Sequence, residues 1–408
     1  MHHLEKMQKN LAPFLAQDFH LLPPFYPLLL QFCETLSAAL FQQQDLKDYP
    51  DFAALAFWLR KSHLHQMQQT FNQKSSSQCI LMPRGLVFHF PPANIEAMFV
   101  YSWAASLLAG NANLIRIPGT NSLRFQKLLD IVLEILGRQE FTRIQQMTDF
   151  IHYMHEDELT AWISSKVDVR ILWGGDATIE KLRKIPLKAS AKDLAFPDRF
   201  SYAAIQADSF LKLTAEEKNK TVSHFFNDIF WFDQTACSSP RLIFWVGDAE
   251  TIQTASQLFY QELQDAITQH HYEISLGNFL FKQTFIYNQS LTLPVQRVSW
   301  LSNELAILFL EKASNACRIH CGQGLLYHVA IAELEEIASF TTSQDQTLTY
   351  TGFSPNELHM FVLSLNGKGL TRLVPFGQAL NFDVVWDGHD LLMELTQPVT
   401  LQLQGDTP

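Results

Sequence analysis

Two rhythms of apolar and polar positions divide the first half of the chain. Up to about residue 70, apolar residues recur at helical spacing over 28–40 and again over 52–64, which predicts helices. Residues 1–70 are therefore expected to form an N-terminal helical region. The polar stretch 72–78 follows and predicts a linker or a solvated hairpin arm.

From residue 80 the rhythm changes to short apolar runs that stop at proline or glycine and alternate with longer helical segments. The predicted strands are 85–90, 114–117, 169–173 and 199–205, and the predicted helices are 95–109, 123–136 and 177–184. Strands that alternate with helices predict a doubly wound, mostly parallel sheet. We expect this domain to span residues 71–210.

A second α/β domain is expected over residues 211–385. Its predicted elements are the helices 250–269 and 303–317 and a strand at 325–331. Loosely alternating residues at 392–404 predict an edge strand, and an exposed edge invites pairing with another subunit. Residues 386–408 are therefore expected to form a β extension for oligomerisation.

Composition narrows the class of protein. The chain has 408 residues, which is too long for a single core. Its net charge of −11 argues against nucleic acid or an anionic membrane surface as the main partner. Five irregularly spaced cysteines favour a reduced, intracellular protein. The N-terminus lacks a signal-peptide pattern, and the apolar segment 97–110 is too short to span a membrane, so a cytoplasmic protein is expected.

Cys237 lies in a turn of small residues between a helix-like apolar run at 225–232 and a strand-like run at 242–246. Both flanks would hold the thiol still at the lip of a sheet. A thiolate attacks carbonyl carbons and forms thioesters, so Cys237 is a candidate nucleophile. The other reading of the pattern is a buried cysteine that acts as a small hydrophobe.

A strand-to-helix junction follows Phe90, where the chain reads Pro91-Pro92-Ala93-Asn94. Ligands bind at such carboxyl ends of strands in α/β domains. Asn94 either caps the following helix or aims its side-chain N–H at a developing oxyanion, and the sequence leaves both readings open.

The next strand-to-helix junction along the chain carries a basic side chain. Arg116 ends a predicted strand shortly before Gly119, and no carboxylate follows until Asp130. Nothing nearby in the sequence would therefore repel a ribose 2′-phosphate. Arg124 and Lys127 on the following helix either add to this site or form a solvated basic face.

Trp173-Gly174-Gly175-Asp176 combines a strand end, a glycine turn and a helix start. Backbone N–H groups and the helix dipole suit a pyrophosphate there. The run is not the G-x-G-x-x-G fingerprint, so its signal is weak when taken alone.

Three residues that could bind a metal ion, Cys317, His320 and Cys321, lie close together in the sequence. A zinc site needs a fourth ligand and usually paired C-x-x-C elements, and neither is present in the sequence. We therefore expect no metal site.

Taken together, these stretches resemble the aldehyde dehydrogenase superfamily, and more closely the acyl-CoA reductase (LuxC) family of bacterial bioluminescence operons. Segments similar to the superfamily are 91–94, 108–118 and 234–237 with Arg241 and Leu242. Segments similar to the acyl-CoA reductase branch are 173–176, 196–201, 374–380 and 386–388. The similarity runs in order from about residue 80 to the C-terminus.

The resemblance implies an α/β, aldehyde dehydrogenase-like fold with two doubly wound α/β domains plus the β extension. Residues 71–210 would bind the nicotinamide nucleotide, and 211–385 would carry the cysteine. The implied reaction is NADPH-dependent reduction of a long-chain fatty acyl-CoA, or of an acyl-enzyme thioester, to the fatty aldehyde through an S-acyl Cys237. Asn94 and the Cys237 N–H would stabilise the oxyanion. The implied nucleotide-binding residues are Phe90, Pro91, Pro92, Arg116, Gly119, Trp173, Gly174 and Gly175.

The implied partners are a fatty acyl-CoA or acyl-protein donor, an acyl-protein synthetase and further copies of the chain in a homo-oligomer. Two departures from the superfamily bear on the reaction. Aldehyde-oxidising members carry a glutamate base, and the matching stretch 193–198 has none, so the acyl-enzyme should persist until it is reduced or passed to another thiol. Asp233 replaces the usual glycine, and a carboxylate near the thiol would raise its pKa.

Two alternatives remain open from the sequence. One is an aldehyde dehydrogenase that oxidises free aldehydes, against which the missing glutamate argues. The other is a non-catalytic acyl-binding scaffold subunit built on the same fold.

Overall fold

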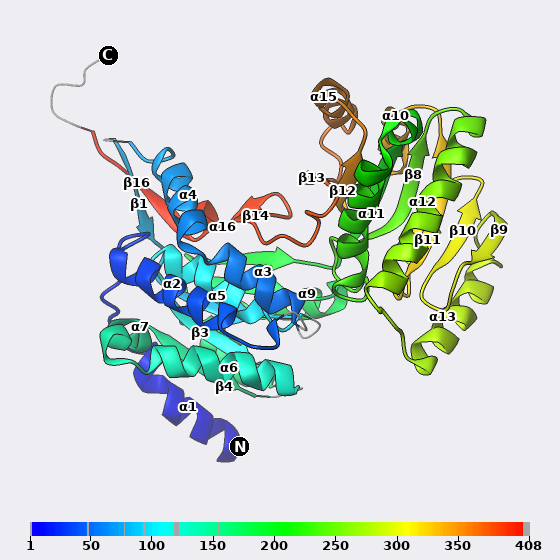
Figure 1. The fold of residues 1–408 in the computed structure, drawn as a ribbon. Helices are drawn as coiled ribbons and strands as arrows, with labels where there is room; N and C mark the ends of the chain where they lie inside the picture. The colour runs from blue at the N-terminus through cyan, green and yellow to red at the C-terminus, as the bar shows by residue number, and fades with distance from the viewer. Residues whose placement is uncertain are drawn as a thin grey trace. The chain divides into compact units, whose positions relative to one another are not determined.

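The structure, a computed structural model, describes residues 2–46, 49–76, 78–92, 95–117, 122–153 and 156–402. The chain divides into two compact units. The discontinuous unit consists of Met1–Asp198 and Phe382–Pro408, and the inserted unit consists of Arg199–Asn381. The chain therefore passes from one unit to the other twice (Figure 1).

A five-stranded parallel sheet forms the centre of the discontinuous unit, in the order β4-β3-β2-β5-β6. Its strands are β2 (Leu86–Phe90), β3 (Ala112–Ile117), β4 (Thr148–His152), β5 (Val169–Trp173) and β6 (Lys192–Phe196). The central strands β2 and β5 are buried along their whole length, as is typical of parallel strands covered on both faces. The predicted parallel α/β architecture is confirmed.

Helices fill the connections between these strands. They are α5 (Met98–Leu108), α6 (Leu123–Leu136), α7 (Thr142–Gln146), α8 (Asp157–Ser164) and α9 (Asp176–Arg183). Every residue of α5 is buried, which accounts for its uncharged sequence. Within the described ranges, no helix is both long enough and apolar enough to cross a membrane.

Four helices precede this sheet: α1 (His2–Leu15), α2 (Pro27–Phe41), α3 (Pro50–Trp58) and α4 (Lys61–Asn72). Proline opens α2 and α3, at a position where the missing N–H has no helical partner to lose. The helix predicted at 52–64 is two helices. The apolar pattern runs across the break because Leu59 and Leu64 are both buried. In the fold, α2 packs against α3, α5 and α6 (Figure 1).

The end of the chain returns to the discontinuous unit. There β16 (Thr396–Thr400) pairs antiparallel with β1 (Cys79–Pro83), and β14 (Val385–Trp386) forms a hairpin with β15 (His389–Asp390). The hairpin residues Asp387 and Gly388 have φ angles of 49° and 76°, as a type I′ turn requires. The strand predicted at 392–404 is present only as β16, because α16 (Leu391–Glu394), capped by the Asp390 side chain, precedes it.

A seven-stranded sheet forms the centre of the inserted unit, in the order β13-β12-β7-β8-β11-β10-β9. Its strands are β7 (Phe200–Gln206), β8 (Pro240–Val246), β9 (Val295–Trp300), β10 (Ala306–Leu310), β11 (Leu325–Ile331), β12 (Asp345–Thr351) and β13 (Arg372–Pro375). Among them only β9, at one edge, runs antiparallel to its neighbour. Alternate residues of β7 and β8 enter two different apolar clusters, so both faces of the sheet are covered.

The helices of the inserted unit are α10 (Ala207–Lys212), α11 (Ala215–Phe230), α12 (Ala249–Gln269), α13 (Leu276–Gln289), α14 (Ile337–Phe340) and α15 (Pro355–Ser364). A capping box of Thr214 and Glu217 starts α11, which ends shortly before the predicted nucleophile. The strand predicted at 199–205 is present as β7, but it belongs to this sheet rather than to the sheet of the discontinuous unit.

The helix predicted at 303–317 is wrong. Residues 306–310 form β10, and Asn315–Arg318 form a 3₁₀ turn. An apolar run that is buried on both faces fits a core helix and a core strand equally well in sequence. The parallel pairing of β10 with β11, which the local sequence does not encode, selects the strand.

Candidate active site

The turn that carries Cys237 joins the end of α11 to the start of β8. Asp233 and Gln234 leave the helix with φ angles of 51° and 60°, a conformation that non-glycine residues keep only when their surroundings hold them. The Gln234 N–H donates to the Ile229 carbonyl at 2.8 Å and so satisfies one of the last helical acceptors. Cys237 is half-buried, so the residue is not part of the fully buried core.

Gln234 fastens this turn to two strands of the sheet. Its side chain is fully buried. The amide Nε2 donates to the carbonyls of Pro240 and Leu325, both at 2.9 Å, and Oε1 accepts from Gly324 N at 3.0 Å. Pro240 begins β8 and Leu325 begins β11. A side chain that donates twice and accepts once must be an amide, which explains the residue type at this position.

Ser201 of β7 holds the backbone of Cys237, the predicted nucleophile, in place. Ser201 Oγ donates to the Cys237 carbonyl at 2.7 Å and accepts from Thr347 N at 3.2 Å. The serine is fully buried. The Cys237 turn is therefore tied to β7 as well as to β8 and β11.

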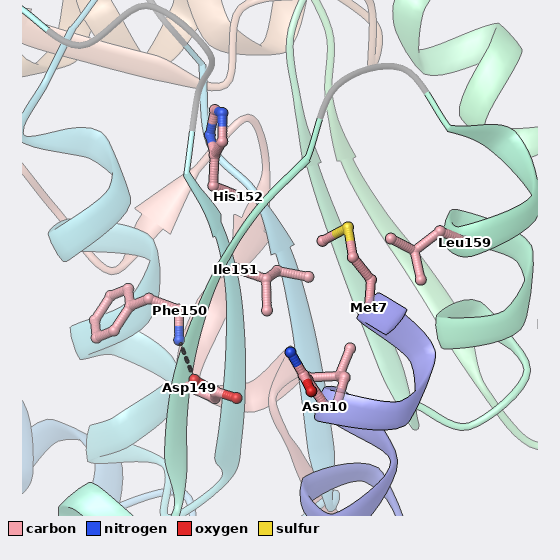
Figure 2. Close-up of a pocket in the computed structure, with 8 residues that line it drawn as sticks. Met7, Asn10, Asp149, Phe150, Ile151, His152 and Leu159 are labelled. Atoms are coloured by element: carbon pink, nitrogen blue, oxygen red, sulfur yellow. Dashed lines mark hydrogen bonds between the residues drawn. The ribbon is translucent and has the colours of Figure 1, made fainter. Parts of the chain in front are cut away.

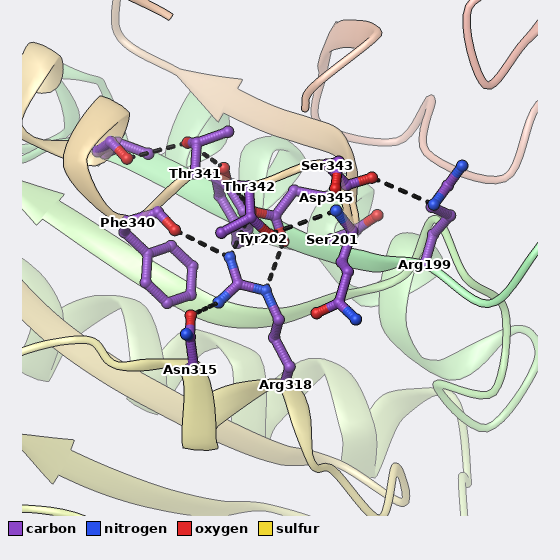
Figure 3. Close-up of polar contacts among 12 residues, drawn as sticks. Arg199, Ser201, Tyr202, Asn315, Arg318, Phe340, Thr341, Thr342, Ser343 and Asp345 are labelled. Atoms are coloured by element: carbon purple, nitrogen blue, oxygen red, sulfur yellow. Dashed lines mark hydrogen bonds and ion pairs between the residues drawn. The ribbon is translucent and has the colours of Figure 1, made fainter. Parts of the chain in front are cut away.

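A buried ion-pair network lies next to Ser201 (Figure 3). Arg318 Nε donates to Asp345 Oδ1 at 3.0 Å, and Nη1 donates to Asn315 Oδ1 at 2.7 Å. The Arg318 guanidinium carbon lies 4.2 Å from the ring centroid of Phe340. Because its donors are occupied by protein groups, Arg318 has a structural role in joining the segment around it to β12.

The neighbouring histidine is also part of the protein framework. His320 Nδ1 accepts from Gly322 N at 2.9 Å, and Nε2 lies 3.0 Å from the Leu325 carbonyl. Burial lowers the pKa of His320 well below its ordinary value. In the part of the chain that the structure describes, no group of His, Cys, Asp and Glu side chains could hold a metal ion.

Three other cysteines are poor candidates for a nucleophile. Burial raises the pKa of the Cys33 and Cys321 thiols to about 12 and also raises the pKa of Cys317. A thiol held protonated reacts slowly, because the thiolate is the attacking species. These shifts favour Cys237, the half-buried cysteine of the predicted turn, over those three.

The Asp233 side chain accepts a hydrogen bond from a tyrosine. Its Oδ1 accepts from Tyr272 Oη at 2.7 Å. Burial, and then the Asp233 carboxylate, raise the pKa of Tyr272. The effect of Asp233 on the pKa of Cys237 stays a prediction.

On the discontinuous unit, Trp173 at the carboxyl end of β5 is fixed by two contacts. Its ring stacks on Phe196 with centroids 4.0 Å apart and planes 14° apart, and Nε1 donates to Ser102 Oγ at 3.1 Å. The same hydroxyl lies 2.8 Å from His89 Nδ1. Burial lowers the pKa of His89 to about 4, so this histidine is neutral near pH 7.

The glycine turn that follows leaves room in front of α9. Gly174 has a φ of 155° and donates its N–H to the Phe196 carbonyl at 3.2 Å. Gly175 is the N-cap residue of α9. A Cβ added to Gly175 would meet none of the described atoms within 4 Å. The start of α9 is therefore uncovered at Gly175, although its first turn carries the Asp176 carboxylate, and anion binding there stays a prediction.

Arg116, at the end of β3, lies against two aromatic rings. Its guanidinium carbon is 5.0 Å from the ring centroid of Tyr153 and 5.8 Å from that of Phe90. Nη2 donates to the Tyr153 carbonyl at 3.2 Å, whereas the buried Nε has no hydrogen-bond partner among the described residues. A buried N–H without a partner is rare, so Arg116 retains donor capacity for a ligand.

The other basic side chains predicted nearby are neutralised within the unit. Arg124 pairs with Asp51 and Glu96, and Lys127 pairs with Asp45. Asp45 and Asp51 come from the N-terminal helical region, and Glu96 comes from the connection between β2 and α5. Both side chains are engaged in ion pairs within the unit, and whether they contact a nucleotide stays a prediction.

The stretch that lacks the glutamate base lies on β6, and its first carboxylate is occupied. Asp193 accepts from Arg170 Nε at 2.7 Å and from Arg170 Nη2 at 2.8 Å. Arg170 is fully buried, and the two residues are register partners on adjacent strands. A carboxylate held by such a bidentate pair is poorly suited to activate water.

A loop after β13 is anchored to α11 by one buried acid. Asp228 accepts from Gly377 N at 2.8 Å and from Ala379 N at 2.9 Å. Burial raises the pKa of Asp228 to about 7. The Phe376 ring packs on Phe225 at 4.7 Å. The segment 374–380 is therefore anchored to α11 by an apolar contact as well as by the buried acid.

A pocket of about 250 Å³ lies between α1, β4 and α8 (Figure 2). Its walls include Met7 of α1 and Ile151 of β4, with Asn10 and Asp149 as polar groups. Burial raises the pKa of Asp149. None of the predicted site residues is among the described residues that line this pocket.

Comparison with known proteins identifies the family. The family model described as acyl-CoA reductase (LuxC) matches residues 61–398. The chain belongs to this acyl-CoA reductase family. A long-chain acyl-protein thioester reductase of Aliivibrio fischeri is 22% identical over 77% of this chain and 62% of the relative. Long-chain acyl-protein thioester reductase 2 of Photobacterium leiognathi is 25% identical over 46% of this chain and 36% of the relative. The chain thus spans less than two thirds of each relative's length.

The fold of this LuxC-family chain is that of the aldehyde dehydrogenases. Lactaldehyde dehydrogenase from Escherichia coli superposes with a TM-score of 0.63 over 98% of this chain and 90% of the other, at 14% identity. At that identity the likeness shows the fold alone. The aldehyde dehydrogenase-like fold expected from the sequence is confirmed.

The predicted site residues of the LuxC-family chain fall on two units. Cys237 lies in the inserted unit. The predicted nucleotide-binding residues at the ends of β2, β3 and β5 lie in the discontinuous unit, namely Phe90, Pro91, Pro92, Arg116, Trp173, Gly174 and Gly175. Asn94 and Gly119 lie outside the described residues.

Sequence reasoning missed the contacts made by three side chains described above: Ser201, Asp228 and Gln234. Gln234 gave a partial signal, since it stands in the nucleophile segment. Ser201 and Asp228 act on backbone groups 36 and about 150 residues away, and no local pattern marks such contacts.

Proposed function

We propose that this chain is an NADPH-dependent reductase that converts a long-chain fatty acyl thioester to the fatty aldehyde through an S-acyl Cys237. The proposal rests on one observation above all, the half-buried Cys237 in a turn fixed by Gln234 and Ser201, in a chain of the acyl-CoA reductase family. The curated relatives are named long-chain acyl-protein thioester reductases. A thioester on coenzyme A or on a donor protein is therefore the proposed substrate.

In the first half-reaction, the Cys237 thiolate attacks the thioester carbonyl carbon. The resulting oxyanion collapses, the bond from carbon to the donor sulfur breaks, and the donor thiolate leaves and takes up a proton. The acyl group stays on Cys237. The Asn94 side chain and the Cys237 N–H are the proposed oxyanion donors, and loss of one such donor typically lowers the rate by about 10²–10³-fold.

In the second half-reaction, NADPH, when held by the discontinuous unit, would supply a hydride to the acyl carbon on Cys237. The thiohemiacetal oxyanion on Cys237 is stabilised by the same two donors. Its bond from carbon to sulfur then breaks, which releases the aldehyde and returns the thiolate. The Asp193 carboxylate is held by Arg170, so hydrolysis of the acyl-enzyme is expected to compete poorly.

The discontinuous unit offers groups that fit the nucleotide. Arg116 has an N–H without a partner among the described residues, and Gly175 leaves the start of α9 open. Because Arg124 and Lys127 are paired with acids, Arg116 is the proposed contact for the 2′-phosphate of NADPH. The stretch 71–210 remains the proposed nucleotide-binding region, and 211–385 the proposed catalytic region.

Mass spectrometry of the intact protein tests the proposal. The wild type, exposed to a mixed pool of acyl-CoA thioesters, should gain one acyl group and lose it when NADPH is added. Cys237→Ser should gain none, whereas Cys79→Ser, which changes another half-buried cysteine, should behave as the wild type. Normal reduction by Cys237→Ser would refute the assignment. Stable acylation without discharge by NADPH would favour the scaffold alternative.

We also propose a homo-oligomer formed through the β extension, and an acyl-protein synthetase as a donor partner. The cross-strand partners Ile80 and Val399, and nearby Met82, are each 41–44% exposed on the β1–β16 ribbon. Such an apolar surface on an unpaired edge suits association with another copy. Light scattering of the purified protein measures the oligomeric state, and a monomer at micromolar concentration would contradict the oligomer.

A further inference from the structure

Helix α13 reverses the usual placement of side chains. Lys282 at its centre is fully buried, at 0% exposure, whereas Leu276 and Tyr287 are 72% and 61% exposed. Burial of a charged side chain is unfavourable unless hydrogen bonds compensate for the lost water. Lys282 points into the protein while Leu276 of the same helix is exposed, and this placement indicates that Lys282 makes specific contacts inside the protein.

The Lys282 ammonium joins two chain segments that are distant in sequence. Nζ donates to the Asn303 carbonyl at 2.6 Å and to the Gln323 carbonyl at 2.8 Å. One turn earlier on the same helix, Asn278 Nδ2 donates to Gln323 Oε1 at 3.1 Å. Gln323 is therefore held by α13 through both its backbone and its side chain.

The loop around Gln323 has an unusual backbone. Gly322, Gln323 and Gly324 have φ angles of 70°, 58° and 72°, all in the left-handed region. Glycine is needed on either side, since a Cβ would lie 3.0 Å from the Asp233 carbonyl oxygen at Gly322 and 1.9 Å from the Glu304 carbonyl oxygen at Gly324. Gln323 has no such freedom, so its conformation depends on the contacts made by α13.

This loop packs directly on the turn that carries Cys237. Gln323 N donates to the Asp233 carbonyl at 3.2 Å, and Gly324 N donates to Gln234 Oε1 at 3.0 Å. A continuous set of hydrogen bonds thus runs from Lys282 through Gln323 to Asp233 and Gln234. Both of these residues have left-handed φ angles themselves and lie four and three positions before Cys237 in the same turn.

We propose that Lys282 is a positioning residue, which holds the loop 322–324 against the Cys237 turn so that the sulfur is presented in a geometry able to attack the acyl thioester. This inference rests on the proposed function of Cys237 as nucleophile. A shift of about 1 Å in a reacting group lowers the rate by about 10²-fold, so a brace of this kind matters for rate without any contact with the substrate.

The brace does not depend on the charge of the lysine. Burial lowers the pKa of Lys282 to about 8, opposed by Cys321 and Glu304. An ammonium offers three N–H donors and a neutral amine offers two. The two carbonyl acceptors are served in both forms.

Single-turnover acylation of Cys237 by palmitoyl-CoA, read by mass spectrometry, tests the inference. Lys282→Met, which keeps the aliphatic stem and removes the donors, should acylate at least about tenfold more slowly at saturating palmitoyl-CoA, with the half-saturating concentration within twofold of wild type. Lys282→Arg, which restores donors, should recover most of the rate. Ile286→Ala, at a fully buried position on the same helix, should lower the melting temperature but leave the acylation rate within twofold.

A surface pair guards against a variant that fails to fold. Asn278→Ala removes the second contact to Gln323 at an exposed position, and Asn288→Ala is its matched exposed control on α13. We expect Asn278→Ala to slow acylation about threefold and Asn288→Ala to leave it unchanged. Wild-type rates in both Lys282→Met and Asn278→Ala, or equal slowing by Ile286→Ala, would overturn the positioning role. A wild type that is never acylated at Cys237 would instead overturn the proposed function and this inference with it.

Discussion

Replacement of Gln234 by glutamate is the sharpest test of how the Cys237 turn is held. The two side chains have nearly the same shape, but a carboxylate cannot donate to the carbonyls of Pro240 and Leu325, each now at 2.9 Å from Nε2. Each buried carbonyl left without a donor costs about 1–3 kcal/mol. The Leu325 carbonyl keeps a donor in His320 Nε2 at 3.0 Å, so the loss falls mainly on the Pro240 carbonyl. Gln234→Glu should therefore lower the free energy of unfolding by at least about 1–3 kcal/mol at pH 8.

The loss of stability in Gln234→Glu should depend on pH, because proton binding by the introduced carboxyl is linked to folding. A buried carboxyl surrounded by carbonyl oxygens favours its protonated form, so the pKa of the introduced carboxyl in the folded state should lie above the unfolded value of about 4.3. The folded state then binds more protons, and the stability of the variant falls as pH rises from about 4 through the folded pKa. Protonation restores one O–H donor, so part of the loss should be recovered at low pH.

Urea unfolding of wild type and variant between pH 5 and pH 8, followed by tryptophan fluorescence, measures this difference. Gln257→Glu on α12, an exposed position, is the matched control and should show a small difference that is flat with pH. If Gln234→Glu unfolds within about 1 kcal/mol of wild type, or if its deficit does not change with pH, the side-chain amide is not what fixes the turn.

Two further predictions concern the charged side chains of Arg116 and Asp228. Arg116→Ala should raise KM for NADPH at least about tenfold and leave acylation of Cys237 by palmitoyl-CoA unchanged, because the 2′-phosphate contact belongs to the nucleotide alone. Equal kcat/KM with NADH and NADPH in the wild type would remove that role. Burial raises the pKa of Asp228 to about 7, so the folded state binds an extra proton between about pH 4 and pH 7, and stability falls as pH rises through that window. Asp228→Asn should remove this slope in urea unfolding, and an unchanged slope would assign it to another group.

Much of the scaffold could be predicted because local signals and tertiary contacts agree. Strands such as β2 and β5 are short apolar runs that stop at proline or glycine, and the structure buries them at the centre of a parallel sheet. The helix predicted at 303–317 failed because β10 is apolar on both faces, and only its pairing with β11 identifies it as a strand.

The site was predictable in its chemistry but not in its supports. The cysteine and its glutamine stand close together in the sequence. Lys282 looks like an ordinary surface lysine among apolar residues, and its burial depends on carbonyls 21 and 41 residues further along the chain. Arg124 and Lys127 looked available for a phosphate, because the acids that neutralise them come from residues 45–96.

The split of the discontinuous unit has a consequence for how the protein is made. The inserted unit is complete in sequence at residue 381, so it can fold without the C-terminal segment that the discontinuous unit needs. The discontinuous unit must wait, because Arg84 Nε donates to the Glu394 carbonyl, 310 residues later, and β1 has β16 as its strand partner. A chain that ends before residue 382 would carry a complete inserted unit and an incomplete discontinuous unit. Strand β1 of the incomplete unit would lack its partner β16 and expose apolar residues, so chaperones would be expected to retain this species.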